Sequence, residues 1–186
     1  MDKRYCKNDL TIWTDFVKGD RAAFAYLYNK YIQELYNYGF KICGDEELVK
    51  DAIQEIFVSI YLNKHKLSQP KSVKFYLMLA LKRAVIKKIV QKRKSIFHDD
   101  FEPFFEPDLS IESSVVNQEE IEEQKTQVLQ LLESLPSKQK EAVYLRFVEG
   151  LDYEEIAEIL EVNIESARKQ IYRAVKSMRD QLNKNY

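Results

Sequence analysis

Apolar side chains recur at spacings of three and four residues through long stretches of this chain. The longest run consists of Phe24, Leu27, Tyr28, Tyr31, Leu35, Tyr38 and Ile42. That spacing places the side chains on one face of an α-helix. The 186 residues include only 4 Gly and 4 Pro, which disfavours turn-rich all-β folds and Gly-rich nucleotide-binding loops. The sequence therefore predicts an all-α protein.

Capping residues divide the N-terminal part into four predicted helices. Asp20 can cap the long second helix, Gly44 can end it, and Asp45 can cap the third. A polar loop over residues 63–71 separates the third helix from a fourth over about residues 72–93. We therefore expect an N-terminal helical domain.

The C-terminal part shows a short helix, a tight turn and a longer helix. Ser137 can cap the helix before this pattern, and Asp152 with Glu155 can form a capping box that opens the short helix. A turn over residues 161–163 follows, and Asn163 can cap the last helix. The last helix is expected to bury Ala167, Ile171, Ala174, Val175 and Met178. This arrangement is typical of a helix-turn-helix.

Charge is distributed unevenly, although the formal net charge is only -1. Residues 1–97 carry 19 basic and 10 acidic side chains, whereas residues 98–124 carry 10 acidic side chains and no basic one. The segment after residue 124 has 10 of each sign. Because the acidic stretch contains Pro and lacks a helical period, the sequence predicts two small domains joined by a flexible linker.

The predicted domains span residues 1–95 and 125–186, and the acidic linker spans residues 96–124. Three aromatic residues of the linker are candidate anchors on a partner: Phe101, Phe104 and Phe105. Equally, the linker could pack locally on the first domain.

The outward face of the last helix suits DNA. Its members are Glu165, Ser166, Arg168, Lys169, Tyr172, Arg173 and Lys176. An α-helix fits the major groove, where Arg can pair with guanine and Lys can neutralise phosphate. An exposed helix can also be rich in Lys and Arg for solubility alone. The preceding short helix and turn favour DNA binding.

The fourth predicted helix is cationic as well. Between Asn63 and Phe97 the chain has 11 Lys and Arg and no Asp or Glu. The candidate DNA-contacting cations of this helix are Lys82, Arg83, Lys87 and Lys88. A solvated helix normally interleaves Glu as i,i+4 partners, so the absence of acids favours nucleic acid over a merely soluble face.

Two further polar surfaces flank this helix in the sequence. In the loop before it, Asn63, His65, Ser68 and Gln69 could hold an unstacked base, although many helix connections carry such residues. On the third helix, Asp51, Gln54 and Glu55 form a polar ridge that could dock another protein. From periodicity alone, a solvated face explains that ridge more simply.

No residues form a catalytic or metal-binding pattern. The two histidines, His65 and His98, lie in a basic loop and an acidic segment, and Cys6 and Cys43 are far apart. We therefore expect no enzyme activity, no cofactor and no metal. No apolar run approaches the ~18 residues of a membrane span, and the N-terminus lacks a signal peptide. The sequence thus predicts a cytoplasmic protein without membrane insertion.

Two stretches resemble conserved regions of a known family. Residues 135–157 read LPSKQKEAVYLRFVEGLDYEEIA and resemble the fourth conserved region of bacterial sigma factors. Upstream, Gly44-Asp45 followed by DAIQEIF over residues 51–57 resembles the second conserved region. Two such regions, in this order and without a third domain, are similar to the extracytoplasmic-function group of the sigma-70 family.

The resemblance implies a role for each candidate surface. Asp51, Gln54 and Glu55 would dock the clamp helices of the largest subunit of core RNA polymerase. The loop over residues 63–71 would capture a flipped base of the promoter −10 element, and the basic helix after it would contact −10 DNA. The −35 element would be read by Ser166, Arg168, Lys169, Tyr172, Arg173 and Lys176. The acidic linker would run through the polymerase channels, and an anti-sigma factor would hold the chain inactive.

Some positions depart from the family pattern. Glu161 occupies the turn where the family favours Gly, which implies either an ordinary right-handed conformation or mild strain. Phe75 replaces a common Trp, Lys82 a frequent Asn and Gln170 a common Arg.

The sequence thus predicts a sigma factor that delivers core RNA polymerase to promoter DNA and assists duplex opening. One alternative is a stand-alone helix-turn-helix regulator that dimerises through its N-terminal helices. Another is a helical adaptor that binds only proteins.

Overall fold

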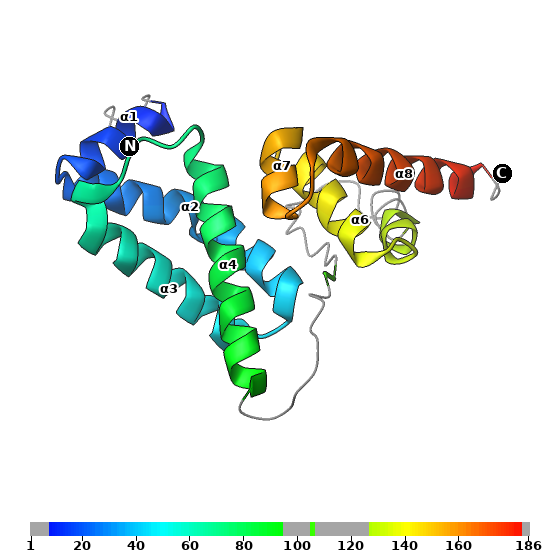
Figure 1. Ribbon diagram of the computed structural model, residues 1–186, viewed down its shortest axis with the longest axis horizontal. Helices are drawn as coiled ribbons and strands as arrows, with labels where there is room; N and C mark the ends of the chain where they lie inside the picture. The colour runs from blue at the N-terminus through cyan, green and yellow to red at the C-terminus, as the bar shows by residue number, and fades with distance from the viewer. Residues whose placement is uncertain (1–7, 95–104, 107–126, 184–186) are drawn as a thin grey trace, which may run out of the picture. The chain divides into compact units, whose positions relative to one another are not determined.

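The computed structural model describes residues 8–94, 105–106 and 127–183 of the chain (Figure 1). The chain divides into two compact units, residues 1–102 and 103–186. All regular secondary structure within the described residues is helical, which confirms the all-α prediction. Among these helices, none is long and apolar enough to cross a membrane.

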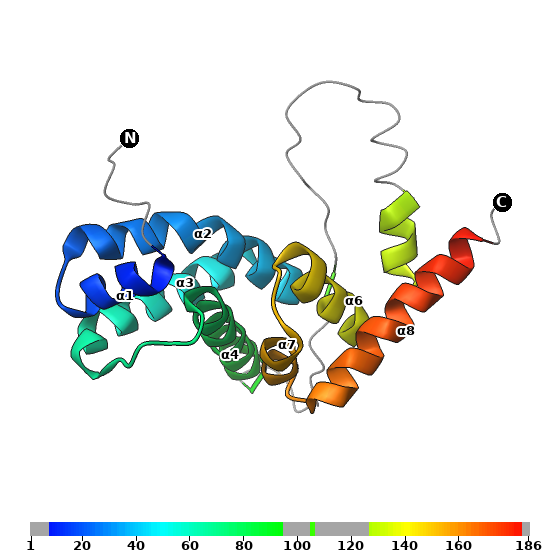
Figure 2. The same ribbon diagram turned by 90° about the horizontal axis from the view of Figure 1, so that it is seen from above.

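Four α-helices build the N-terminal unit: α1 (Asp9–Val17), α2 (Arg21–Cys43), α3 (Glu46–Asn63) and α4 (Val73–Lys94). A short 3₁₀ turn, η2 (Lys64–Lys66), follows α3. The helices α1, α3 and α4 all pack against α2, and α4 also packs against α3 (Figures 1 and 2). The helix α4 is therefore supported by two helices along its length.

The predicted caps of the N-terminal unit are confirmed. The Asp20 side chain accepts hydrogen bonds from two N–H groups in the first turn of α2. Gly44 ends α2 in the left-handed conformation, with φ 62°. The Asp45 side chain accepts a hydrogen bond from the Leu48 N–H at the start of α3. These caps fix the bounds of the helices that carry the candidate surfaces.

Aromatic side chains fill the centre of the N-terminal unit. Trp13 and Tyr38 are 1% and 0% exposed. The Trp13 ring packs edge-on against Tyr76 of α4, with ring centroids 5.2 Å apart. The helices α2 and α3 approach closely at Gly39, where an added Cβ would lie 2.8 Å from a methyl group of Val49. Glycine is thus required at this crossing, although the helical spacing gave no sign of it.

The C-terminal unit contains a helical segment over residues 127–133, then α6 (Ser137–Val143), a π-helical turn η3 (Tyr144–Val148), α7 (Tyr153–Ile159) and α8 (Ile164–Leu182). The helix α8 packs against both α6 and α7. Its core cluster is made by Leu132, Leu135, Val143 and Ala174, with Met178 packed against it.

The helix-turn-helix is formed by α7 and α8. The capping box of Asp152 and Glu155 is confirmed, and Asn163 caps α8 by accepting a hydrogen bond from the Ser166 N–H. Glu161, in the turn, has φ 54°. The right-handed alternative for Glu161 is therefore wrong, and the strained one holds. A residue with a Cβ in this left-handed region costs about 1 kcal/mol.

Two local predictions in the C-terminal unit are wrong. Val175 is 44% exposed, because the buried stripe of α8 follows Ala167, Ile171 and Ala174 and leaves Val175 one position towards solvent. Ser137 is the first residue of α6 and does not cap it. Its Oγ accepts a hydrogen bond from the Phe105 N–H at 2.8 Å instead.

Phe105 belongs to the C-terminal unit. Its side chain is 2% exposed, and its ring lies 5.4 Å from the ring of Tyr144 between centroids. At this residue the predicted linker therefore packs on the second unit and not on the first. Phe101 and Phe104 lie outside the described residues, as do most of residues 96–124.

Candidate nucleic-acid and protein interfaces

The first part of α8 presents the predicted DNA-reading side chains to solvent. Five of them are exposed and Ser166 is half-buried; the exposed ones are Arg168, Lys169, Tyr172, Arg173 and Lys176. Arg168 is ion-paired through its Nη1 to Glu165 Oε1 at 2.9 Å. No ion pair is recorded for the other cations of this face within the described residues. The face can thus offer several unneutralised cations to a polyanion.

The cations of α4 are placed less uniformly. Arg83 and Lys87 are exposed, and neither has an ion pair within the described part of the chain. Lys82 is only 8% exposed, which differs from the solvent-facing position expected for a DNA contact. The reason is that Lys82 lies four residues after Met78 and three before Val85, which are 1% and 0% exposed, so it falls on the buried side of α4. Lys88 is half-buried.

Carboxylates from α2 and α3 neutralise several cations of α4. Lys88 Nζ lies 3.1 Å from Glu55 Oε2, and Lys74 Nζ lies 3.2 Å from Glu34 Oε2. Lys92 Nζ donates to Asp45 Oδ2 at 2.8 Å. This hydrogen bond holds the pKa of the Asp45 carboxyl below its usual range and raises the pKa of Lys92. Although the sequence of α4 contains no acidic residue, carboxylates from other parts of the unit lie beside several of its lysines.

The loop between α3 and α4 is attached to α1. Trp13 Nε1 donates to the Ser68 carbonyl at 3.2 Å, and Gln69 Nε2 donates to the Leu10 carbonyl at 3.5 Å. The four predicted base-contacting residues of the loop are all exposed: Asn63, His65, Ser68 and Gln69. The loop is thus held through the Ser68 carbonyl and the Gln69 side chain, while all four residues remain exposed.

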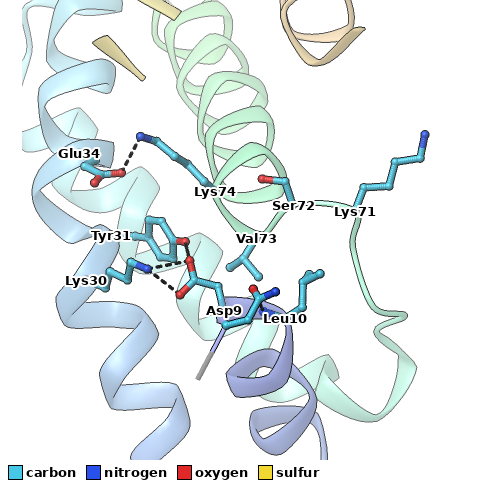
Figure 3. A pocket seen from close by; sticks show the side chains of 10 residues that line it. Asp9, Leu10, Lys30, Tyr31, Glu34, Lys71, Ser72, Val73 and Lys74 are labelled. Atoms are coloured by element: carbon cyan, nitrogen blue, oxygen red, sulfur yellow. Dashed lines mark hydrogen bonds and ion pairs between the residues drawn. The ribbon is translucent and has the colours of Figure 1, made fainter. Parts of the chain in front are cut away.

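Beside this loop lies a polar pocket of about 500 Å³ (Figure 3). Lys30 and Tyr31 of α2 point towards Asp9 of α1, with Lys30 Nζ 2.6 Å from Asp9 Oδ1 and the Tyr31 hydroxyl donating to Asp9 Oδ2. Burial, followed by this hydrogen bond, raises the pKa of Tyr31. Lys71, at the rim, points away from these groups. At this pocket, the contacts of Asp9 with Lys30 and Tyr31 therefore join α1 to α2.

The predicted docking ridge of α3 is exposed along its length. Asp51, Gln54 and Glu55 all face solvent. Two apolar residues, Val58 and Leu62, continue the same face one and two turns after Gln54. They are 49% and 71% exposed. The ridge thus ends in an apolar patch, which is a common composition for a protein interface.

Sequence reasoning missed this apolar extension. A groove of about 570 Å³ adjoins it, lined by Phe24, Tyr28, Gln54, Phe57, Val58 and Leu62 among others. The signal was present, since Val58 and Leu62 follow Gln54 at i+4 and i+8. The buried residues of α3 also recur at spacings of three and four residues. Spacing alone therefore does not distinguish the exposed apolar residues Val58 and Leu62 from the buried ones.

The described residues contain no group of three or more His, Cys, Asp and Glu that could hold a metal ion. Cys43 is half-buried, and burial raises the pKa of its thiol. Cys6 and His98 lie outside the described residues.

Two family models match the chain, and each falls within one structural unit. Residues 27–95 match "Sigma-70 region 2", and residues 125–178 match "Sigma-70, region 4". The chain belongs to the sigma-70 family. The resemblance seen in the sequence is thereby confirmed.

Similar proteins of this family cover most of the chain. The ECF RNA polymerase sigma factor SigW of Bacillus subtilis is 25% identical over 172 residues, which are 89% of this chain and 91% of that protein. The RNA polymerase sigma factor SigV of the same organism is 28% identical over 152 residues, or 82% of this chain and 86% of SigV.

Two solved structures share the sigma-factor fold. CnrH, solved in complex with the cytosolic domain of CnrY, aligns with a TM-score of 0.58 at 16% identity, covering 96% of this chain and 99% of CnrH. The sigma factor RpoE of Bartonella quintana, solved with the anti-sigma factor NepR, aligns with a TM-score of 0.56 at 16% identity, covering 86% of this chain and 96% of RpoE.

Proposed function

We propose that this sigma factor binds core RNA polymerase, directs it to promoters with two separate elements and assists opening of the duplex. The observation that carries the proposal is that the region 2 and region 4 matches lie on different helical units. Each unit has its own exposed cationic side chains. The chain acts as a transcription initiation factor in the cytoplasm and catalyses no reaction itself.

The C-terminal unit reads the −35 element through α8. The exposed side chains of its first turns enter the major groove, where Arg168 pairs with a base edge. Ser166, Lys169 and Tyr172 make neighbouring contacts, and Arg173 and Lys176 bind phosphates. The exposure of these residues on one side of α8, opposite Ala167 and Ile171, supports this assignment.

The N-terminal unit binds the −10 element. Arg83, Lys87 and Lys88 contact phosphates, and the loop residues Asn63, His65, Ser68 and Gln69 hold an unstacked base. The two hydrogen bonds that tie the loop to α1 support this role, since an ordered site captures a base at lower entropic cost. Lys82 is left out of this surface because its side chain is buried.

Core RNA polymerase docks on α3. Asp51, Gln54 and Glu55 supply the polar contacts, and Val58 with Leu62 supplies apolar area that association would bury. All five side chains are exposed on one side of α3, which supports this assignment.

The two units act as domains over residues 1–95 and 125–186, joined by residues 96–124 as a linker within the polymerase. We also propose an anti-sigma partner. The two similar structures were solved with the cytosolic domain of CnrY and with the anti-sigma factor NepR, which supports a partner of that class.

The test is transcription by core polymerase on a library of genomic fragments, with and without this chain. We expect transcripts that depend on the chain, and their loss with Arg168→Ala plus Lys169→Ala. Arg179→Ala is the matched control, since it removes a cation from the last turn of the same helix. The absence of any chain-dependent transcript would contradict the proposal. A stable dimer by light scattering that ignores core polymerase would support the stand-alone regulator instead.

A further inference from the structure

Tyr153 lies beneath two guanidinium groups. It is the first residue of α7 and is half-buried. The Arg146 Cζ lies 4.8 Å from the centroid of its ring, and the Arg168 Cζ lies 5.4 Å from the same centroid. Arg146 comes from η3 and Arg168 from α8, so this one ring joins three elements of the unit.

The first turn of α7 and the Arg146 side chain are each held by hydrogen bonds. The capping box of Asp152 and Glu155 fixes the first turn of α7, from which Tyr153 projects. Arg146 Nη1 donates to the Leu151 carbonyl at 2.8 Å. The backbone that carries Tyr153 is therefore fixed, and one of the two guanidinium groups near its ring is anchored.

Arg168 lies near the same ring and has a second partner in Glu165. Its Nη1 donates to Glu165 Oε1 at 2.9 Å, and its side chain is 56% exposed. The guanidinium thus donates to a carboxylate through Nη1 and lies near an aromatic ring, and no partner of its other N–H groups is recorded in the described residues. An exposed Arg otherwise samples many rotamers, and fixing one before binding lowers the entropy lost on binding.

We propose that Tyr153 is a positioning residue for sequence reading by Arg168. Its ring, which also lies near the anchored Arg146, holds the Arg168 guanidinium in the orientation that pairs with a base edge. The inference deepens the proposed −35 contact and rests on it. Within the described residues, no aromatic contact of this kind is recorded for Lys169, Arg173 or Lys176. Tyr153 therefore sharpens preference at one base pair and not across the whole element.

The experiment uses holoenzyme, made from core polymerase and the full chain, on a promoter library randomised at the upstream element. The variants are Tyr153→Phe, which keeps the ring, and Tyr153→Leu, which keeps apolar volume without the ring. Arg168→Ala and the double variant Tyr153→Leu plus Arg168→Ala complete a cycle. The readout is the base preference at each position of the element.

We expect Tyr153→Leu to weaken preference about two- to five-fold at a single base pair, which is the factor that an exposed cation–π contact supplies. Arg168→Ala should abolish the preference at the same base pair, and Tyr153→Phe should keep the preference of the unsubstituted chain. Tyr153→Leu should add nothing once Arg168 is Ala.

Three results would overturn the proposal: an equal loss in the Arg168→Ala background, a loss spread over all base pairs, or a loss with Phe as large as with Leu. An unsubstituted holoenzyme with no preference at the upstream element would overturn the −35 assignment as well. If the unsubstituted holoenzyme shows a base preference at the upstream element but the effects of Tyr153→Leu and Arg168→Ala are independent, only the positioning role would be overturned.

Discussion

The two cationic helices, α4 and α8, differ in where their counter-charges come from. On α4, Lys74, Lys88 and Lys92 each pair with a carboxylate of α2, of α3 or of the residue that caps α3. On α8, the one ion pair recorded in the described residues is local, from Glu165 to Arg168. A carboxylate from another helix can replace the i,i+4 partners that α4 lacks in its own sequence.

This difference changes what a run of Lys and Arg means. The acid-free sequence of α4 predicts a free cationic surface, yet much of that charge helps to hold the N-terminal unit together. On α8, no carboxylate of another described helix is recorded in an ion pair with the cations of the exposed face. We therefore expect substitutions on α8 to change DNA reading and those on α4 to divide between DNA binding and stability.

The largest expected effect is on α8. Arg168→Ala should cost about 1–3 kcal/mol of promoter binding and relax the preference for one base pair. Arg173→Ala should instead weaken binding to all sequences and lower the dependence of log K on log salt by about 1. Competition binding of holoenzyme over a range of salt concentrations measures both quantities. The same salt slope for both variants would remove the distinction between reading and phosphate contact.

The fold was predictable to a large extent because each cap is a local signal. Asp20, Asp45 and Asn163 mark helix starts by side-chain chemistry alone, and the structure bears them out. The Ser137 cap and the burial of Val175 were local predictions that failed, and the other failures were non-local. The burial of Lys82 and the packing of Phe105 on Tyr144 depend on residues distant in sequence, which no periodicity reveals.

The candidate surfaces were predictable in part for the same reason. A face of one helix follows from spacing, as on α8. Its neutralisation by another helix does not, as the pair of Lys88 and Glu55 shows.

The N-terminal unit should lose about 1 kcal/mol of stability at pH 11 through Tyr31, which is 3% exposed. Burial and the hydrogen bond to Asp9 raise the pKa of this phenol in the folded chain. The unfolded chain releases the proton above about pH 10, so stability is lost as pH rises beyond that value. Urea unfolding followed by Trp13 fluorescence should show a smaller alkaline decline for Tyr31→Phe. Parallel declines in the two chains would contradict the assignment.

A substitution in the turn before α8 should raise the stability of the C-terminal unit by a similar amount. Glu161→Gly should stabilise the C-terminal unit by about 1 kcal/mol, because Gly adopts the left-handed region without the cost of a Cβ. Glu158→Gly is the matched control, since it places Gly inside α7 and should destabilise by about 1 kcal/mol. Hydrogen exchange of amides in α7 and α8 reports both changes. Destabilisation by Glu161→Gly would show that the strain is absent.

The smallest expected effect is on α4. Glu55→Gln should raise the affinity of the free chain for DNA about two-fold at low salt, because it releases Lys88 from an exposed ion pair. Asp51→Asn is the control: it removes one charge from the same face, and no ion pair is recorded for Asp51 within the described residues. Fluorescence anisotropy with a labelled duplex measures both variants. An equal rise for both would show a general charge effect and not the release of Lys88.

The proposed function depends most on the recognition of two different promoter elements by the two units. The direct measurement is transcript-start mapping with holoenzyme on a library randomised separately at the −35 and −10 elements. We predict that Arg168→Ala alters preference only at the upstream element, whereas Asn63→Ala and Gln69→Ala alter it only at the downstream one. Changes by both sets of variants at the same element, or by neither at any element, would contradict the account.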